Sequence, residues 1–131
     1  MTEPLWLSRT QVEAIHEDLL HEHGGLAGLR APEGLESALA RPINIFLHEK
    51  CDLADLAAAY AHGIVKNHPF NDGNKRTAFA VAAVFLDLNG LEITMSEQDA
   101  TLMVLKLTDS SITQRKFAEY LRENSRKTKR F

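Results

Sequence analysis

The nine residues from 68 to 76, His-Pro-Phe-Asn-Asp-Gly-Asn-Lys-Arg, place a histidine, a carboxylate, a lysine and an arginine in one short stretch. Its centre, residues 71–73, has the composition of a tight turn, because Asn and Asp bond to nearby backbone and Gly tolerates a positive φ. The alanine-rich segment 74–88 that follows predicts a helix that is apolar nearly all round, and such helices are buried. The stretch is therefore predicted to be a loop that leads into a central buried helix.

Two cations, Lys75 and Arg76, fall in the first turn of this predicted helix. The free N–H groups and the positive dipole end of a helix N-terminus disfavour cations and favour phosphate groups. Folding alone does not explain these two side chains, whereas a bound anion does. Arg76 offers a planar two-point contact to a phosphate and Lys75 a point charge. The sequence thus predicts a phosphate-binding helix N-terminus.

The same stretch resembles the core motif of the Fic/Doc family, His-x-Phe-x-(Asp/Glu)-(Gly/Ala)-Asn-(Gly/Lys)-Arg, at every fixed position. With Lys75 at the position that holds Gly or Lys, the motif resembles that of the Doc branch, the death-on-curing toxins of toxin–antitoxin modules. Adenylylating Fic proteins usually have Gly there, and a second arginine where this chain has Phe79. Residues 23–38 resemble the early segment of Doc-like proteins, so the resemblance covers about residues 8–122. It implies one all-α domain over residues 1–131, a compact bundle of about six helices with a possible short β flap.

The resemblance also implies a site that binds ATP and Mg²⁺. Asp72 would hold the metal, since Mg²⁺ is typically bound by one or two carboxylates plus substrate phosphates. His68 would take a proton from an attacking hydroxyl, because imidazole titrates near neutral pH. Phe70 is expected to anchor the motif loop in the core. The other expected nucleotide ligands are Gly73, Asn74, Lys75, Arg76 and Lys66, of which Lys66 fits a solvated charge equally well.

In function, the resemblance implies a Doc-type toxin and protein kinase that transfers the γ-phosphoryl group of ATP to a hydroxyl of a translation factor. Elongation factor Tu and one of its threonines are the expected target, and translation would stop. Two alternatives stay open: AMP transfer to a protein hydroxyl, as in the Fic branch, and a catalytically inactive module that only binds a partner.

The chain lacks the (Ser/Thr)-x-x-x-Glu-(Gly/Asn) pattern of the inhibitory helix that many Fic proteins carry. Leu29 and Glu119 stand four residues before Glu33 and Glu123, where the pattern needs Ser or Thr. Inhibition is therefore expected from a separate Phd-like antitoxin whose disordered C-terminal segment folds on binding. A groove between the first helix and residues 43–47 is the candidate docking place.

Composition narrows the remaining possibilities. A single cysteine, Cys51, rules out an intrachain disulfide and a thiol-rich metal site. With neither a signal peptide nor a long apolar run in the sequence, we expect a cytoplasmic protein without a membrane partner. The net charge of −3 hides a basic segment at 122–131, so the body is acidic and nucleic acid is not an expected partner. Residues 125–131 are predicted to be a flexible tail.

Capping residues and stop signals predict five further helices. These run from Ser8 to Gly24, from Pro32 to Pro42, from Asp52 to the motif, from Ser96 to Leu107, and from Thr113 to about Arg122. Residues 43–50 fit either a continuation of the second of these helices or an extended flap. Residues 5–7 and 91–94 are candidates for short extended segments.

Overall fold

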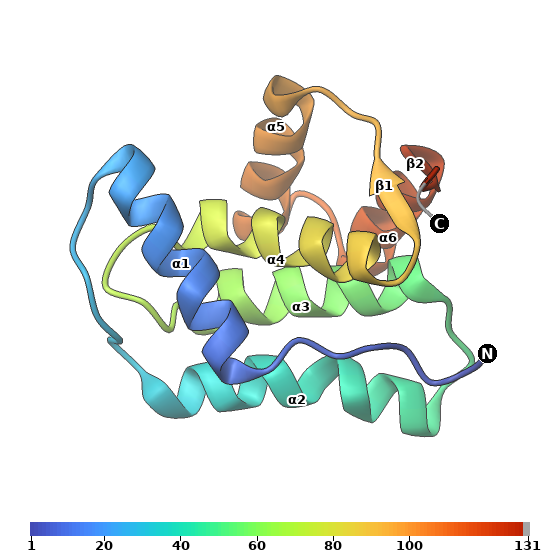
Figure 1. Ribbon diagram of the computed structural model, residues 1–131, viewed down its shortest axis with the longest axis horizontal. Coiled ribbons are helices and arrows are strands. Elements are labelled where there is room, and N and C mark those ends of the chain that lie inside the picture. Colours follow the sequence, from blue (N-terminus) through green and yellow to red (C-terminus); the bar gives the residue numbers. More distant parts are fainter. Residues whose placement is uncertain (130–131) are drawn as a thin grey trace.

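A computed structural model describes residues 1–129, in which six helices enclose one core and a two-stranded sheet lies at one edge (Figure 1). The elements are α1 (Arg9–His23), α2 (Pro32–His48), α3 (Leu53–Asn67), α4 (Asn74–Leu88), β1 (Leu91–Ile93), α5 (Glu97–Thr108), α6 (Gln114–Glu123) and β2 (Ser125–Lys127). The predicted helical bundle is confirmed.

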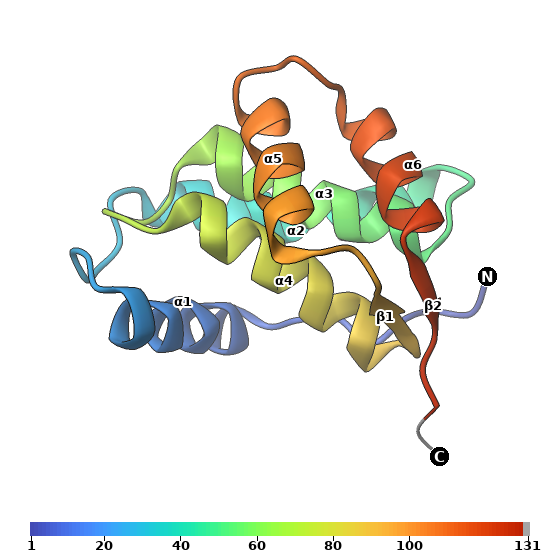
Figure 2. The same ribbon diagram turned by 90° about the horizontal axis from the view of Figure 1, so that it is seen from above.

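Helices α3 and α4 form the centre of the bundle, with α2 against α3, and α1 and α5 against α4 (Figures 1 and 2). Most of α3 is buried, and its many alanines allow close packing. A Cβ atom added at Gly63 would lie 2.9 Å from the Cα and Cβ atoms of Ala38 on α2. Helix α4 is central as predicted, but Val84 and Leu88 are exposed on its open face.

The helices begin where the sequence places capping residues. The side chains of Ser8, Asp52, Ser96 and Thr113 each accept a hydrogen bond from the backbone N–H three residues further on. These bonds satisfy donors that the first turn of a helix leaves free. The predicted starts of α1, α3, α5 and α6 are therefore confirmed.

The prediction that Pro42 ends the second helix is wrong. Helix α2 continues through Pro42 to His48, so residues 43–48 are helical and form no flap. Proline removes one helical hydrogen bond, but Pro42 is buried and Ile45 and Phe46 continue the apolar face that packs on the core. Burial of this face outweighs the local defect.

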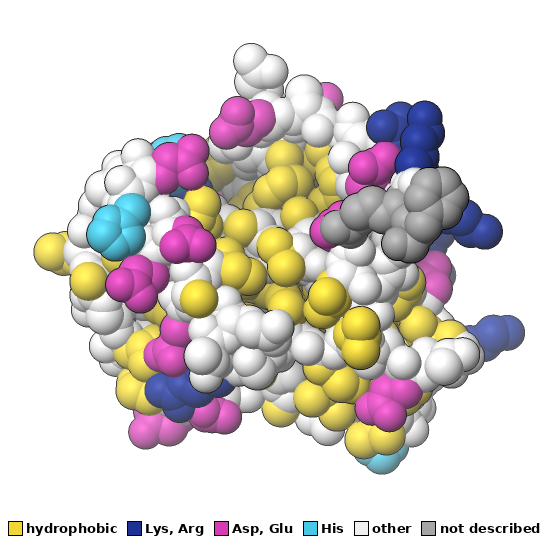
Figure 3. Space-filling view, viewed as in Figure 1, with side chains coloured by type: hydrophobic (Ala, Val, Ile, Leu, Met, Phe, Trp, Pro, Cys, Tyr) yellow, Lys and Arg dark blue, Asp and Glu magenta, His cyan; other side chains and the backbone are white. Residues whose placement is uncertain are grey.

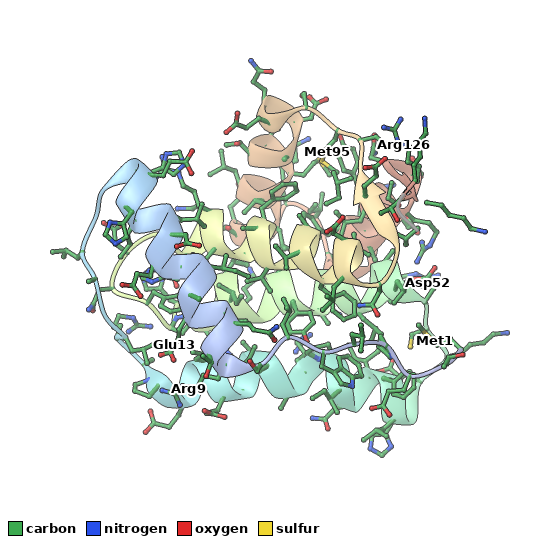
Figure 4. The ribbon with its side chains drawn as sticks, in the orientation of Figure 1. Met1, Arg9, Glu13, Asp52, Met95 and Arg126 are labelled. Carbon is green, nitrogen blue, oxygen red and sulfur yellow. The ribbon has the colours of Figure 1, made fainter. Side chains whose placement is uncertain are left out.

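A short antiparallel β ladder joins the end of α4 to the end of α6. Leu91 pairs with Lys127 and Ile93 with Ser125, and Arg126 donates from Nε to Glu92 Oε1 at 2.6 Å (Figure 4). The extended segment predicted near 91–94 is confirmed, and residues 125–127 of the predicted tail form strand β2. Residues 130–131 of the predicted tail lie outside the described residues. The ladder is thus the short β element of this fold.

No helix within residues 1–129 has the length and apolar character needed to cross a bilayer.

Candidate functional site

The motif loop, residues 68–73, connects the end of α3 to the beginning of α4. His68 ends α3 in a left-handed conformation with φ 48°, and Gly73 precedes α4 with φ 77°. The loop lines a cleft of about 480 Å³ that α5 closes on the other side. The cleft is lined by Val65, His68, Asn71, Asp72, Gly73, Asn74, Lys75, Arg76, Thr101 and Thr108.

Asn74, the first residue of α4, fixes the interior of the motif loop. It is 5% exposed, and its Oδ1 accepts from the backbone N–H of Phe70 at 3.0 Å. Its Nδ2 donates to the Phe70 carbonyl at 2.9 Å and lies 3.1 Å from Nδ1 of His68. Phe70 itself is buried in the core and stacks on the ring of His16, with 3.8 Å between ring centroids. Phe70 is therefore the residue of the motif loop that packs into the core.

A second loop, residues 24–31, lies along the motif loop and is here called the glycine loop. The backbone N–H groups of Arg30 and Ala31 both donate to the Pro69 carbonyl, at 2.7 and 3.0 Å. The N–H of Asn71 donates to the Gly28 carbonyl at 3.0 Å. Gly28 has φ 98°, and a Cβ there would lie 3.1 Å from the Asn71 amide nitrogen, so only glycine suits this approach. The glycine loop thus sets the shape of the motif loop.

Asp72 has a fixed carboxylate. Its Oδ1 accepts from the Gly73 N–H at 2.9 Å and its Oδ2 from the Leu26 N–H at 3.3 Å. Its carbonyl oxygen lies 2.8 Å from Nε2 of His16, which therefore carries a proton and donates. Each carboxylate oxygen keeps a lone pair for a cation after these bonds. Within residues 1–129 no three His, Cys, Asp or Glu side chains group as a metal site, so water or substrate oxygens would complete the coordination of a metal at Asp72.

Lys75 and Arg76 are exposed at the N-terminus of α4, where the first turn holds no acidic residue. Among residues 1–129 neither side chain has a hydrogen-bond or ion-pair partner. Lys66 does not itself line this cleft: its Nζ donates to the carbonyl of Thr108 at 3.2 Å and to the hydroxyl of Ser110, and Lys66 lines a different cavity. The structure therefore brings together His68 and residues 72–76, but not Lys66.

Several side chains of the site carried no role in the sequence-based prediction. Thr101 and Thr108 line the cleft from α5, and nothing in the spacing of that helix singles them out. His16 and Arg30 support the motif loop from outside it. Arg30 belongs to the early segment that resembles Doc-like proteins, and its contact to the motif is a role which that resemblance does not specify.

Comparison with known proteins identifies the family. Residues 6–86 match the model of the Fic/DOC family, and the chain belongs to this family, as its motif predicts. It is 33% identical over 99 residues to the protein kinase doc of Escherichia phage P1, which covers 75% of this chain and 79% of that protein. It is 38% identical over 74 residues to the toxin Doc of Mycolicibacterium smegmatis, which covers 53% of this chain and 55% of that protein.

Proposed function

We propose that this protein is a Doc-type toxin that acts as a protein kinase and transfers the γ-phosphoryl group of ATP to a protein hydroxyl. The observation that carries the proposal is the pair of cations Lys75 and Arg76, which have no side-chain partner among residues 1–129, at a helix N-terminus that shares one cleft with His68 and Asp72. The name of the phage P1 relative, a protein kinase, supports the same reaction.

The N-terminus of α4 supplies the phosphate site in this proposal. The backbone N–H groups of its first turn lack helical partners and point toward the cleft end of the helix. Lys75 adds a point charge and Arg76 a planar guanidinium that holds two phosphate oxygens at once. An ATP polyphosphate bound here would offset the unfavourable placement of both cations at the positive end of the helix dipole.

Asp72 fits a Mg²⁺ ion that arrives with the nucleotide. Its carboxylate lines the cleft, is held by two backbone N–H groups and keeps free lone pairs. Mg²⁺ prefers one or two carboxylates together with substrate phosphates, which suits a site with a single carboxylate. The ion would supply neutralisation of the negative charge on the phosphates.

His68 is the proposed base. Phosphoryl transfer requires chiefly positioning and charge stabilisation, so one group that takes the proton of the target hydroxyl suffices. The hydroxyl oxygen forms the new bond to the γ-phosphorus, the bond to the bridging oxygen breaks, and ADP leaves. The exposed ring of His68 at the cleft is accessible to such a hydroxyl.

The proposed partners are a target and an antitoxin. We expect the target to be a translation factor, elongation factor Tu with a threonine, in the cytoplasm. For the antitoxin, Figure 3 shows hydrophobic side chains gathered in a hollow between α1 and α5, over α4. A cavity of about 370 Å³ at β1 continues this apolar surface, which suits an apolar antitoxin segment. The apolar side chains that line this cavity include Phe79, Ala83, Ile93, Met95 and Ala100. The cavity and the hollow together are an alternative docking place to the groove expected between the first helix and residues 43–47.

The decisive experiment incubates the purified protein with bacterial lysate, Mg²⁺ and ATP that carries label at either the γ- or the α-phosphate. Transfer of γ-label to one protein band, lost in His68→Ala, supports the kinase. Transfer of α-label instead would make the protein an adenylyltransferase despite Lys75, whose side chain fills space that Gly leaves open in the Fic branch. Label from neither position, with retained toxicity of His68→Ala, would favour a module that acts by binding alone.

A further inference from the structure

The side-chain amide of Asn74 has only one orientation that its surroundings allow. Oδ1 faces the backbone N–H of Phe70 at 3.0 Å, and Nδ2 faces the Phe70 carbonyl at 2.9 Å. Exchange of oxygen and nitrogen would set two donors against each other and two acceptors against each other, in a site that is 5% exposed. The NH₂ group is therefore the part of the amide that faces His68.

This orientation determines the hydrogen on the His68 ring. The second proton of the Asn74 NH₂ group points at Nδ1 of His68, 3.1 Å away. A donor opposite Nδ1 requires that Nδ1 carries a lone pair, so in the neutral ring the proton is on Nε2. With that proton in place, Nε2 can donate a hydrogen bond into the cleft but cannot take a proton from a hydroxyl.

We infer that Asn74 is a positioning residue that locks neutral His68 in the Nε2–H form, and that His68 becomes a base only when this contact is released. The inference rests on the proposed function for its catalytic consequence alone. A base at Nε2 needs a proton on Nδ1, and Nδ1–H cannot coexist with the Asn74 NH₂ group opposite it. With this contact in place His68 cannot act as the base at Nε2, so catalysis requires that the His68 ring moves away from Asn74.

The test is the ¹⁵N spectrum of the histidine side chains at about pH 9, where ordinary imidazoles are neutral. In the wild-type protein we expect Nδ1 of His68 to be unprotonated and Nε2 to be protonated. We also expect a scalar coupling across the hydrogen bond between Asn74 Nδ2 and His68 Nδ1. A proton on Nδ1, or an unprotonated Nδ1 without this coupling, would overturn the lock. His68→Ala assigns the signals.

Free imidazole already favours Nε2–H, so a variant must show that Asn74 imposes the state. Asn74→Asp replaces the donor by an acceptor, and we expect the proton to move to Nδ1. The ring of His16 reports whether the loop is intact, because its Nε2–H donates to the Asp72 carbonyl. An unchanged His68 tautomer together with an intact His16 signal would contradict the inference. If the variant loses the His16 signal, its loop is disrupted, and the coupling between Asn74 and His68 in the wild-type protein then decides whether the inference holds. Neither measurement needs nucleotide or target, so the kinase proposal stands or falls separately.

Discussion

The guanidinium of Arg30 donates from Nε to the carbonyl oxygen of His68 at 2.9 Å and from Nη2 to that of Asn67 at 3.2 Å. Both carbonyls end α3 and lack helical partners. His68 also has φ 48°, a conformation that costs energy for a residue with a side chain. Arg30 therefore stabilises the backbone that carries the proposed base, from a loop nearly forty residues earlier in the chain.

Arg30→Ala should lower both stability and activity. We expect the free energy of unfolding to fall by about 1–3 kcal/mol, because two charge-assisted hydrogen bonds are lost. Turnover at saturating ATP should fall more than the apparent ATP affinity, since His68 is displaced while the α4 N-terminus is not. Urea denaturation and γ-label transfer measure the two effects.

Arg9→Ala is the matched control, because Arg9 makes only exposed ion pairs with Glu13 and Glu36. Solvent screens such exposed pairs, which contribute little, so this variant should keep wild-type turnover. Equal losses in the Arg9 and Arg30 variants would show that Arg30 has no special role in the site.

The sequence predicts the local structure well wherever one residue decides it. Ser8, Asp52, Ser96 and Thr113 begin helices because each has a side-chain oxygen for the first free N–H groups. Pro42 misleads, because the cost of a proline in a helix is local whereas the apolar face that outweighs it extends over the whole of α2. Strand β2 at 125–127 could not be predicted, because its sequence Ser-Arg-Lys lacks the alternation of apolar and polar residues that marks a strand. It forms by pairing with β1, which lies more than thirty residues earlier in the chain.

In the candidate site, too, the sequence predicts what neighbouring residues decide and misses what tertiary packing decides. The motif residues from His68 to Arg76 lie together because they are adjacent in sequence, and their common cleft follows from one turn. Lys66 is only two residues from His68, but it lies within α3 and bonds to the end of α5, whereas His68 follows α3 in a left-handed conformation. His16 and Arg30 reach the motif through tertiary packing, which periodicity alone does not encode.

His62 should make stability depend on pH near neutrality. Burial, with Arg41 and Lys66 nearby, lowers the pKa of His62 to about 4, and its Nδ1 is buried without a partner among residues 1–129. Between an unfolded pKa near 6.5 and this folded value, the unfolded chain binds a proton that the folded chain does not. Stability should therefore fall as pH drops from about 6.5 to 4, by about 1–2 kcal/mol given the partial exposure of the ring.

Urea denaturation of His62→Gln between about pH 7.5 and 5 checks this sign, because a glutamine at position 62 does not titrate. Its stability should vary less with pH than that of the wild type. His48→Gln, a change at an exposed histidine, is the control and should leave the pH dependence unaltered. A pH profile of His62→Gln that overlays the wild-type profile would remove His62 as the cause.

Asp52 should contribute stability that acid removes. Its hydrogen-bonded pair with Arg122, at 2.7 and 2.9 Å, lowers the pKa of Asp52 from 3.8 to about 2. The contribution is present above pH 3.8 and is lost as pH falls toward 2. Both side chains are about half exposed, so we expect no more than about 1 kcal/mol.

Asp52→Asn isolates the ion pair, because asparagine caps a helix as well as aspartate does. The wild type should be more stable than this variant at about pH 6, and the difference should shrink toward about pH 3. Asp52→Ala should lose the cap as well, at about 1 kcal/mol more and at every pH. A wild-type advantage over Asp52→Asn that grows in acid would contradict a lowered pKa of Asp52 in the folded protein.

Two lysines near the motif should separate nucleotide binding from stability. Lys75→Met removes a cation at the N-terminus of α4 and should weaken ATP binding by about tenfold or more, as expected for a lost charge-assisted phosphate contact of about 1.5–3 kcal/mol. Lys66→Met removes a side chain bonded to the end of α5 and to Ser110 in the loop after it, so it should lower the free energy of unfolding slightly and leave ATP affinity unchanged. Equilibrium binding of ATP with Mg²⁺, compared with urea denaturation of both variants, measures the contrast. An equal loss of ATP affinity in both variants would show that Lys66 also contacts the phosphates. Wild-type affinity in Lys75→Met would show that Lys75 at the N-terminus of α4 does not bind them.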